Sequence, residues 1–184
     1  MAPIFCFWCT FVLLFAYTHS QSLLISTDAL TLLNNRNQLK RYLYSPKNAK
    51  DSYVYMVDIN DFKSINDLYG HSEGDRALIT VSQALKRVCG RTIFPIFLCR
   101  YGGDEFLLIV RTDDPGYIAE LIHEELAEGS LQMQKENNLP YKIQASIGYV
   151  SWDGNPSHFK DSLKLADHKM YEQKKMNSQR KKSA

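Results

Sequence analysis

The sequence is poor in the residues on which small secreted and low-complexity proteins depend. Its 184 residues include four cysteines, nine glycines and six prolines. The cysteines of its body are not closely spaced, which excludes a disulfide scaffold. The low glycine content, together with a hydrophobic fraction of 45%, excludes a collagen-like or disordered chain. The length fits one well-buried domain with a short appendage.

The net charge of the chain is also low, at +2. Basic residues gather at the C-terminal end, where six Lys or Arg stand against one Glu between Lys169 and Ala184. The rest of the chain is therefore slightly acidic. Because an acidic body lacks the basic surface that binds nucleic-acid polymers, we expect no such partner.

No charged residue occurs within residues 1–27, and the run from Ile4 to Tyr17 is almost wholly apolar. A bilayer-spanning helix needs about 17 to 20 apolar residues, which this segment reaches only with its polar flanks. The alternatives are a signal peptide, which normally begins with positive charge, and a cytosolic amphipathic or buried helix. We expect residues 1–27 to be an apolar segment that anchors the chain in a membrane through residues 2–20.

The first basic residues follow this segment, at Arg36, Lys40 and Arg41. Lys and Arg close to a membrane span are normally retained on the cytoplasmic side. The pattern therefore predicts a location at the inner, cytoplasmic membrane, with the body of the chain facing the cytoplasm.

The body alternates between strand and helix patterns. Runs rich in β-branched and aromatic residues predict strands, and apolar residues at helical spacing predict helices. Two of the strands are joined by a glycine turn, which indicates a hairpin. This order predicts an α+β fold of the ferredoxin-like type, a mostly antiparallel sheet with a central β-hairpin and helices on one face. The strands are expected at Tyr53–Ile59, Ile93–Tyr101, Phe106–Arg111 and Tyr141–Trp152, and the helices within Asp28–Tyr44 and at Phe62–Tyr69, Gly74–Cys89, Tyr117–Gln134 and Phe159–Lys175.

Three carboxylates would meet at one edge of this sheet if the hairpin strands lie beside the first strand. Asp58 comes at the end of the first strand, and Asp104 and Glu105 lie in the turn of the hairpin. Carboxylates with a carbonyl and waters are the ligands of Mg²⁺, and two such ions can hold both oxygens of a phosphoryl displacement. The alternative for Asp104 and Glu105 is a solvated acidic turn. Asp58 is harder to explain in that way, because an unpaired carboxylate ending a buried strand is costly.

The hairpin turn carries a resemblance to a known family. Arg100–Phe106 (RYGGDEF) resembles the signature of the GGDEF family of diguanylate cyclases. Five further segments resemble the family's other motifs in the same order and spacing, so we expect a GGDEF domain over residues 28–176 and a basic tail over 177–184. These segments are Asp28–Thr31 with Asn35 and Arg36; Asp58–Lys63 with Asn66 and Asp67; Gly70 and His71 with Gly74 and Asp75; Ser146–Gly148; and Ala166 and Asp167 with Tyr171 and Lys174.

The resemblance implies a reaction and a partner. Two GTP would condense to cyclic di-GMP with release of two pyrophosphates, and two subunits would face each other, each presenting one GTP. Phosphoryl transfer asks a protein mainly for positioning and charge neutralisation. The alternative is a degenerate GGDEF module that binds nucleotide, or serves as an interaction domain, without catalysis.

The resemblance also implies roles for single residues. Asp58, Asp104 and the Ile59 carbonyl would hold Mg²⁺ (or Mn²⁺). Glu105 would complete the metal site or help to deprotonate the attacking 3′-hydroxyl, and which of Asp104 and Glu105 is the base stays open. The substrate residues would be Asn66 and Asp75 at guanine, where adenine cannot satisfy a carboxylate acceptor, and Lys63 and Lys174 at the triphosphate.

The sequence departs from the family pattern at several positions. Leu32 stands where the family usually has Gly, and Asn60 where a second acidic residue is common. Asn177–Gln179 replaces the usual Gly-Arg-Asn, whose Arg contacts phosphate. The family's inhibitory Arg-x-x-Asp is replaced by Ile93–Ile96, so we expect no inhibitory product site.

Overall fold

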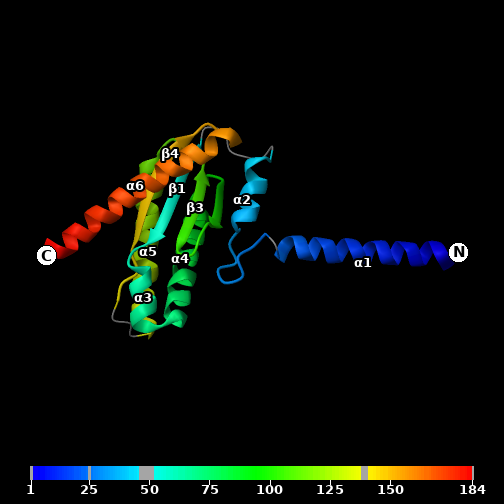
Figure 1. Cartoon of the computed structure of the whole chain (residues 1–184), viewed down its shortest axis with the longest axis horizontal. Helices are drawn as coiled ribbons and strands as arrows, with labels where there is room; N and C mark the ends of the chain where they lie inside the picture. Colours follow the sequence, from blue (N-terminus) through cyan, green and yellow to red (C-terminus); the bar gives the residue numbers. More distant parts are fainter. Residues whose placement is uncertain (1, 25, 46–51, 138–140, 184) are drawn as a thin grey trace.

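A computed structural model of the chain describes residues 2–24, 26–45, 52–137 and 141–183 (Figure 1). Within them lie ten helices and strands, and the nine that follow the N-terminal helix come in the order that the sequence pattern predicts. They are α1 (Ala2–Leu24), α2 (Arg36–Leu43), β1 (Ser52–Ile59), α3 (Phe62–Tyr69), α4 (His71–Arg91), β2 (Ile96–Arg100), β3 (Glu105–Val110), α5 (Pro115–Asn137), β4 (Ala145–Trp152) and α6 (Pro156–Ser183).

The four strands form one antiparallel sheet in the order β2-β3-β1-β4. The β2–β3 hairpin therefore lies beside β1, as predicted, and β1 and β3 are the two central strands. Asp58 is opposite Glu105 on one side and Ser146 on the other. This register brings the end of β1 and the hairpin turn to the same edge of the sheet.

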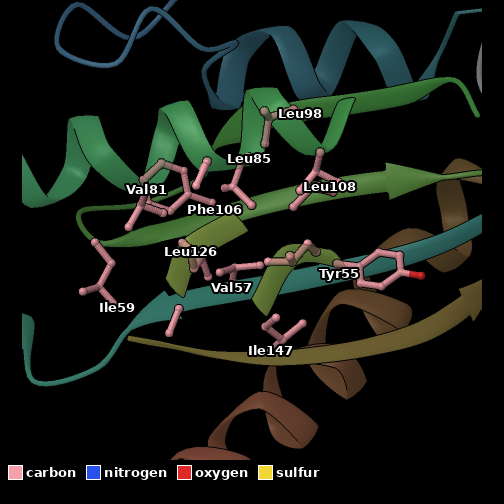
Figure 2. Packing of buried hydrophobic residues seen from close by; sticks show 14 of the residues in the cluster. Tyr55, Val57, Ile59, Val81, Leu85, Leu98, Phe106, Leu108, Leu126 and Ile147 are labelled. Atoms are coloured by element: carbon pink, nitrogen blue, oxygen red, sulfur yellow. The ribbon is translucent and has the colours of Figure 1, made fainter. Parts of the chain in front are cut away.

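Helices cover both faces of the sheet, so the expectation of helices on one face was wrong. Tyr55, Val57 and Ile59 of β1 pack with α4 and α5 in one buried cluster, which Figure 2 shows. Val54 and Met56, which point the other way, belong to a second cluster with α2 and α6. A central strand between two helical layers is apolar on both faces, which explains the unbroken hydrophobic run of β1.

Helix α6 lies unusually close to the sheet at Gly148 of β4. A Cβ atom at Gly148 would come within 2.1 Å of the Ala166 carbonyl oxygen and 2.3 Å of the Met170 nitrogen. Only a residue without a side chain permits this approach. In Figure 1, α6 crosses β4 obliquely, and it also contacts β1. Gly148 thus determines how closely α6 packs on β4, and the C-terminal half of α6 passes the end of β1.

Several element ends differ from the prediction, among them those of β2 and α6. Strand β2 begins at Ile96, after Pro95, whereas Ile93 is 96% exposed. Because proline has no N–H to donate to a ladder, it commonly stands before or at the first residue of a strand. Helix α6 continues to Ser183, so residues 177–183 of the expected tail prolong that helix.

Helix α1 extends away from the body of the chain, and its apolar side chains from Trp8 to Tyr17 are exposed (Figure 1). Among the residues that the structure describes, no helix is long and apolar enough to cross a membrane. The predicted anchor at residues 2–20 is therefore not supported, and the inner-membrane location stays a prediction.

Before α2 the chain makes a turn that is closed by Asp28. The Asp28 carboxylate accepts hydrogen bonds from the Thr31 nitrogen at 2.8 Å and the Thr31 hydroxyl at 2.7 Å. Leu32, where the family usually has Gly, has a φ of 56° and is 71% exposed. A leucine in this left-handed conformation is strained by about 1 to 2 kcal/mol.

We expect Leu32→Gly to raise the free energy of unfolding by about 0.5 to 1 kcal/mol, because relief of this strain exceeds the added flexibility of the unfolded chain. Urea denaturation of the full chain measures the change. Leu68→Gly is the matched control, since Leu68 is 74% exposed but helical, and it should lose about 1 kcal/mol. Destabilisation by both variants would show that Leu32 is not strained.

Candidate active site

The end of β1 and the β2–β3 turn bring two of the predicted carboxylates, Asp58 and Glu105, side by side. Asp58 and Glu105 are cross-strand partners, and the Ile59 nitrogen donates to the Asp104 carbonyl at 3.3 Å. Asp58 is 9% exposed, and Glu105 is half-buried. Cross-strand partners in an antiparallel pair have Cβ atoms about 4.5 to 5.5 Å apart. The two carboxylates therefore share one environment, although they are 47 positions apart in sequence.

One glycine of the turn, Gly102, makes room for the side chain of Glu105. A Cβ atom at Gly102 would come within 2.3 Å of Glu105 Oε2, so this carboxylate folds back over Gly102. The Tyr101 nitrogen closes the turn by donating to the Glu105 carbonyl at 2.8 Å. Arg100 donates to the Gly103 carbonyl at 2.7 Å and pairs with Asp28 at 3.1 Å. The signature turn is thus tied to the turn that precedes α2.

The charges at this edge are predominantly negative. Burial raises the pKa of Glu105, and the neighbouring charges of Asp58, Asp104 and Asp167 raise it further. Burial is also the main cause of a raised pKa at Asp58, with Asp104 and Asp167 adding to it. Asp167 was expected only as part of a motif. Its charge reaches the site because α6 packs across β4, which residue spacing does not reveal.

Two basic residues oppose these charges. Lys174 of α6 forms an ion pair with Asp58 through its Nζ and Oδ1, and it lowers the pKa of Asp58 against the effect of burial. Arg36 of α2 stacks on the Tyr101 ring at 4.4 Å and lowers the pKa of Glu105. Lys174 was expected at a triphosphate, whereas here it contacts the carboxylate. Arg36 was expected only as part of the opening motif.

The residues expected at guanine lie on the α3–α4 pair. Asn66 rests against α4, since a Cβ atom at Gly74 would come within 2.0 Å of its Oδ1. Asp75 is the next residue of α4 and is exposed, as is Lys63 in the first turn of α3. The structure therefore brings Asn66 next to the turn of α4 that carries Asp75. Lys63, Asn66 and Asp75 thus lie on α3 and α4, whereas Lys174 lies on α6.

The carboxylates suit a divalent cation by chemistry. Their oxygen atoms are the donors that Mg²⁺ and Mn²⁺ accept, and burial together with neighbouring negative charge raises the pKa values of Asp58 and Glu105. In the described part of the chain, however, no three Asp, Glu, His or Cys side chains stand close enough to form a ready-made metal site. Asp58 is instead neutralised by Lys174. A cation would have to draw these groups together.

The chain is similar to proteins of a known family. The family model for the diguanylate cyclase GGDEF domain matches residues 25–180. The chain belongs to the GGDEF family. Among curated relatives, the diguanylate cyclase DgcM of Escherichia coli is 35% identical over 156 residues, which are 80% of this chain and 35% of DgcM. The cyclic di-GMP phosphodiesterase PdeB of Shewanella oneidensis is 33% identical over 141 residues, which are 76% of this chain and 16% of PdeB.

Solved GGDEF structures share the fold. The coiled coil and GGDEF domain of DgcB from Caulobacter crescentus, in complex with c-di-GMP, has a TM-score of 0.75 at 24% identity and covers 92% of this chain and 91% of that one. The GGDEF domain alone of DgcB has a TM-score of 0.65 at 28% identity. The chain spans less than half the length of the curated GGDEF relatives named above. The family match and these relatives place the chain among GGDEF domains.

We expect Glu105→Gln to stabilise the fold at neutral pH. The pKa of Glu105 is raised in the folded protein, so the wild type gains stability as pH falls through that folded value toward the unfolded one near 4.5. The glutamine variant has no such gain. Its advantage in melting temperature should therefore be present at pH 7 and vanish toward pH 4.5. A difference in melting temperature that is constant across this range would mean that the ionised form of Glu105 does not destabilise the fold.

Proposed function

We propose that this chain is a diguanylate cyclase that condenses two GTP into cyclic di-GMP and releases two pyrophosphates. The observation that carries the proposal is the cross-strand pairing of Asp58 with Glu105 beside an intact Gly102–Phe106 signature. A degenerate module has no need to keep several like charges together at a half-buried sheet edge, because their mutual repulsion opposes folding.

In this proposal, Asp58, Asp104 and the Ile59 carbonyl hold Mg²⁺ or Mn²⁺, and Glu105 completes the set or acts as base. The cation supplies neutralisation of the triphosphate charge when it is bound. Glu105 is suited to accept the 3′-hydroxyl proton, since its raised pKa makes it a stronger base than an ordinary glutamate. Asp104 is the other candidate for that role.

The substrate is held by residues outside the carboxylate cluster. Asn66 and Asp75 recognise the guanine edge, and Lys63 with Lys174 meets the triphosphate. One subunit presents one GTP, so the 3′-hydroxyl of each nucleotide reaches the α-phosphate of the other only in a homodimer. Pyrophosphate release from GTP by the full chain tests this arrangement. The rate per subunit should rise with protein concentration, and a rate that is independent of concentration would contradict the dimer.

The degenerate alternative also has an observation in its favour. Ser178 stands where the family usually has a phosphate-binding Arg, and it donates to the Lys174 carbonyl within α6. One relative is named a cyclic di-GMP phosphodiesterase. A GGDEF domain that binds GTP and Mg²⁺ but releases no pyrophosphate at any protein concentration would support this alternative.

We expect Asn66→Ala combined with Asp75→Asn to weaken GTP binding by about tenfold or more, because guanine donors lose a charged acceptor. Binding of Mg²⁺–pyrophosphate should stay unchanged, since it has no base. Calorimetry measures both affinities. Asp67→Asn is the control, because Asp67 is exposed and adjacent to Asn66. An equal fall in both affinities would mean that Asn66 and Asp75 only support the fold.

A further inference from the structure

An ion pair links Lys174 to Asp58 at the edge of the sheet that carries the carboxylates. Lys174 Nζ donates to Asp58 Oδ1, with side-chain exposures of 33% and 12%. Lys174 lies on α6 and Asp58 on β1, and the close packing of α6 against Gly148 of β4 sets their relative positions. The contact is therefore a product of helix–sheet packing rather than of a mobile side chain that finds a charge at the surface.

Lys174 compensates a charge that the fold would otherwise leave unpaired. Burying a carboxylate without a partner is costly, and Asp104 and Asp167 add like charge at the same place. Lysine is well suited to temporary pairing, since its ammonium group is a point charge on a flexible stem. Because Lys174 is one-third exposed, it can leave Asp58 for a second anion at the surface without crossing the core.

A divalent cation and the Lys174 ammonium cannot both be neutralised by Asp58. Two cations on one carboxylate repel each other, and this repulsion is screened only weakly at a buried group. Lys174 and the cation therefore compete for the charge of Asp58, and the cation binds more strongly once Lys174 has moved away. The phosphates of a nucleotide bound to the same cation would give the ammonium group a new partner.

Building on the proposed function, we propose that Lys174 is a resident counter-ion of Asp58 that excludes the divalent cation until a nucleoside triphosphate draws it away. The cation consequently binds weakly alone and tightly together with the triphosphate. This coupling is reciprocal, so the triphosphate also binds more tightly in the presence of the cation. Lys174 acts here as a positioning residue that sets the order in which the site fills.

The test measures the affinity of the full chain for Mn²⁺ by electron paramagnetic resonance, in the absence of nucleotide. Lys174→Met should bind Mn²⁺ about tenfold more tightly than the wild type, because the competitor is gone. Lys175→Met makes the same change in net charge, but Lys175 lies over the Tyr171 ring at 4.5 Å instead of on Asp58. It should bind Mn²⁺ like the wild type. Lys174→Arg retains the positive charge of the side chain, so this variant should also bind Mn²⁺ weakly.

A second series adds a non-hydrolysable GTP analogue. The analogue should strengthen Mn²⁺ binding strongly in the wild type and in Lys175→Met, and several-fold less in Lys174→Met. Equal Mn²⁺ affinity of Lys174→Met and the wild type without nucleotide would overturn the inference, as would equal strengthening by the analogue. Neither measurement involves turnover. A chain that binds Mn²⁺ as expected but makes no cyclic di-GMP would refute the proposed function alone.

Discussion

Asp58→Asn is expected to lower cyclic di-GMP formation by about a hundredfold or more while the protein stays folded. The change removes a charged ligand from the proposed metal site, and electrostatic stabilisation is the main contribution a protein makes to phosphoryl transfer. Asparagine has nearly the same shape as aspartate. The raised pKa of Asp58 further indicates that the fold does not depend on its negative charge.

Pyrophosphate release and thermal unfolding, measured on the same preparation, check both parts of this prediction. Asp161→Asn is the matched control, because Asp161 is 82% exposed on α6 and contacts only Lys164 among the ion pairs of the described residues. It should keep full activity. Wild-type turnover in Asp58→Asn would remove the assignment of Asp58 as a metal ligand.

Gly148→Ala is expected to lower the free energy of unfolding by about 3 kcal/mol or more. The added Cβ atom would lie 2.1 Å from the Ala166 carbonyl oxygen and 2.3 Å from the Met170 nitrogen. Both atoms belong to the backbone of α6, so the helix as a whole must move away from β4. Overpacking of this kind is among the few causes of large losses from one substitution.

Urea denaturation of the full chain measures the loss, and Gly90→Ala is its control. Gly90 lies in α4, and no atom stands within 4 Å of a Cβ built there. Its replacement by alanine should be neutral or stabilising by up to about 1 kcal/mol. If Gly148→Ala were as stable as the wild type, the close seat of α6 on the sheet would be wrong, and with it the basis of the Lys174–Asp58 contact.

Local patterns predicted most of the fold. Phe62–Tyr69 was expected as a helix from its apolar spacing and its terminal glycine, and α3 has those bounds. The pairing of Asp58 with Glu105 was predictable on one condition, that the hairpin lies beside the first strand, and β3 does pair with β1. These features depend on neighbours in sequence or on the turn between two strands.

What the patterns missed depends on packing between distant elements. The unbroken apolar run of β1 indicates burial, but it does not reveal that α2 and α6 cover the second face. The contact of Lys174 with Asp58 spans 116 positions. It exists because α6 approaches β4 at Gly148, and a glycine in a strand pattern does not reveal which element approaches it.

The most direct test is identification of the product. The full chain is incubated with GTP and Mg²⁺, with Asp58→Asn as the inactive reference, and the nucleotides are separated and identified by mass spectrometry. The proposed function predicts cyclic di-GMP and two pyrophosphates for each product molecule, formed by the wild type only. Recovery of unchanged GTP from a folded chain that binds both GTP and Mg²⁺ would contradict it and identify a degenerate GGDEF module.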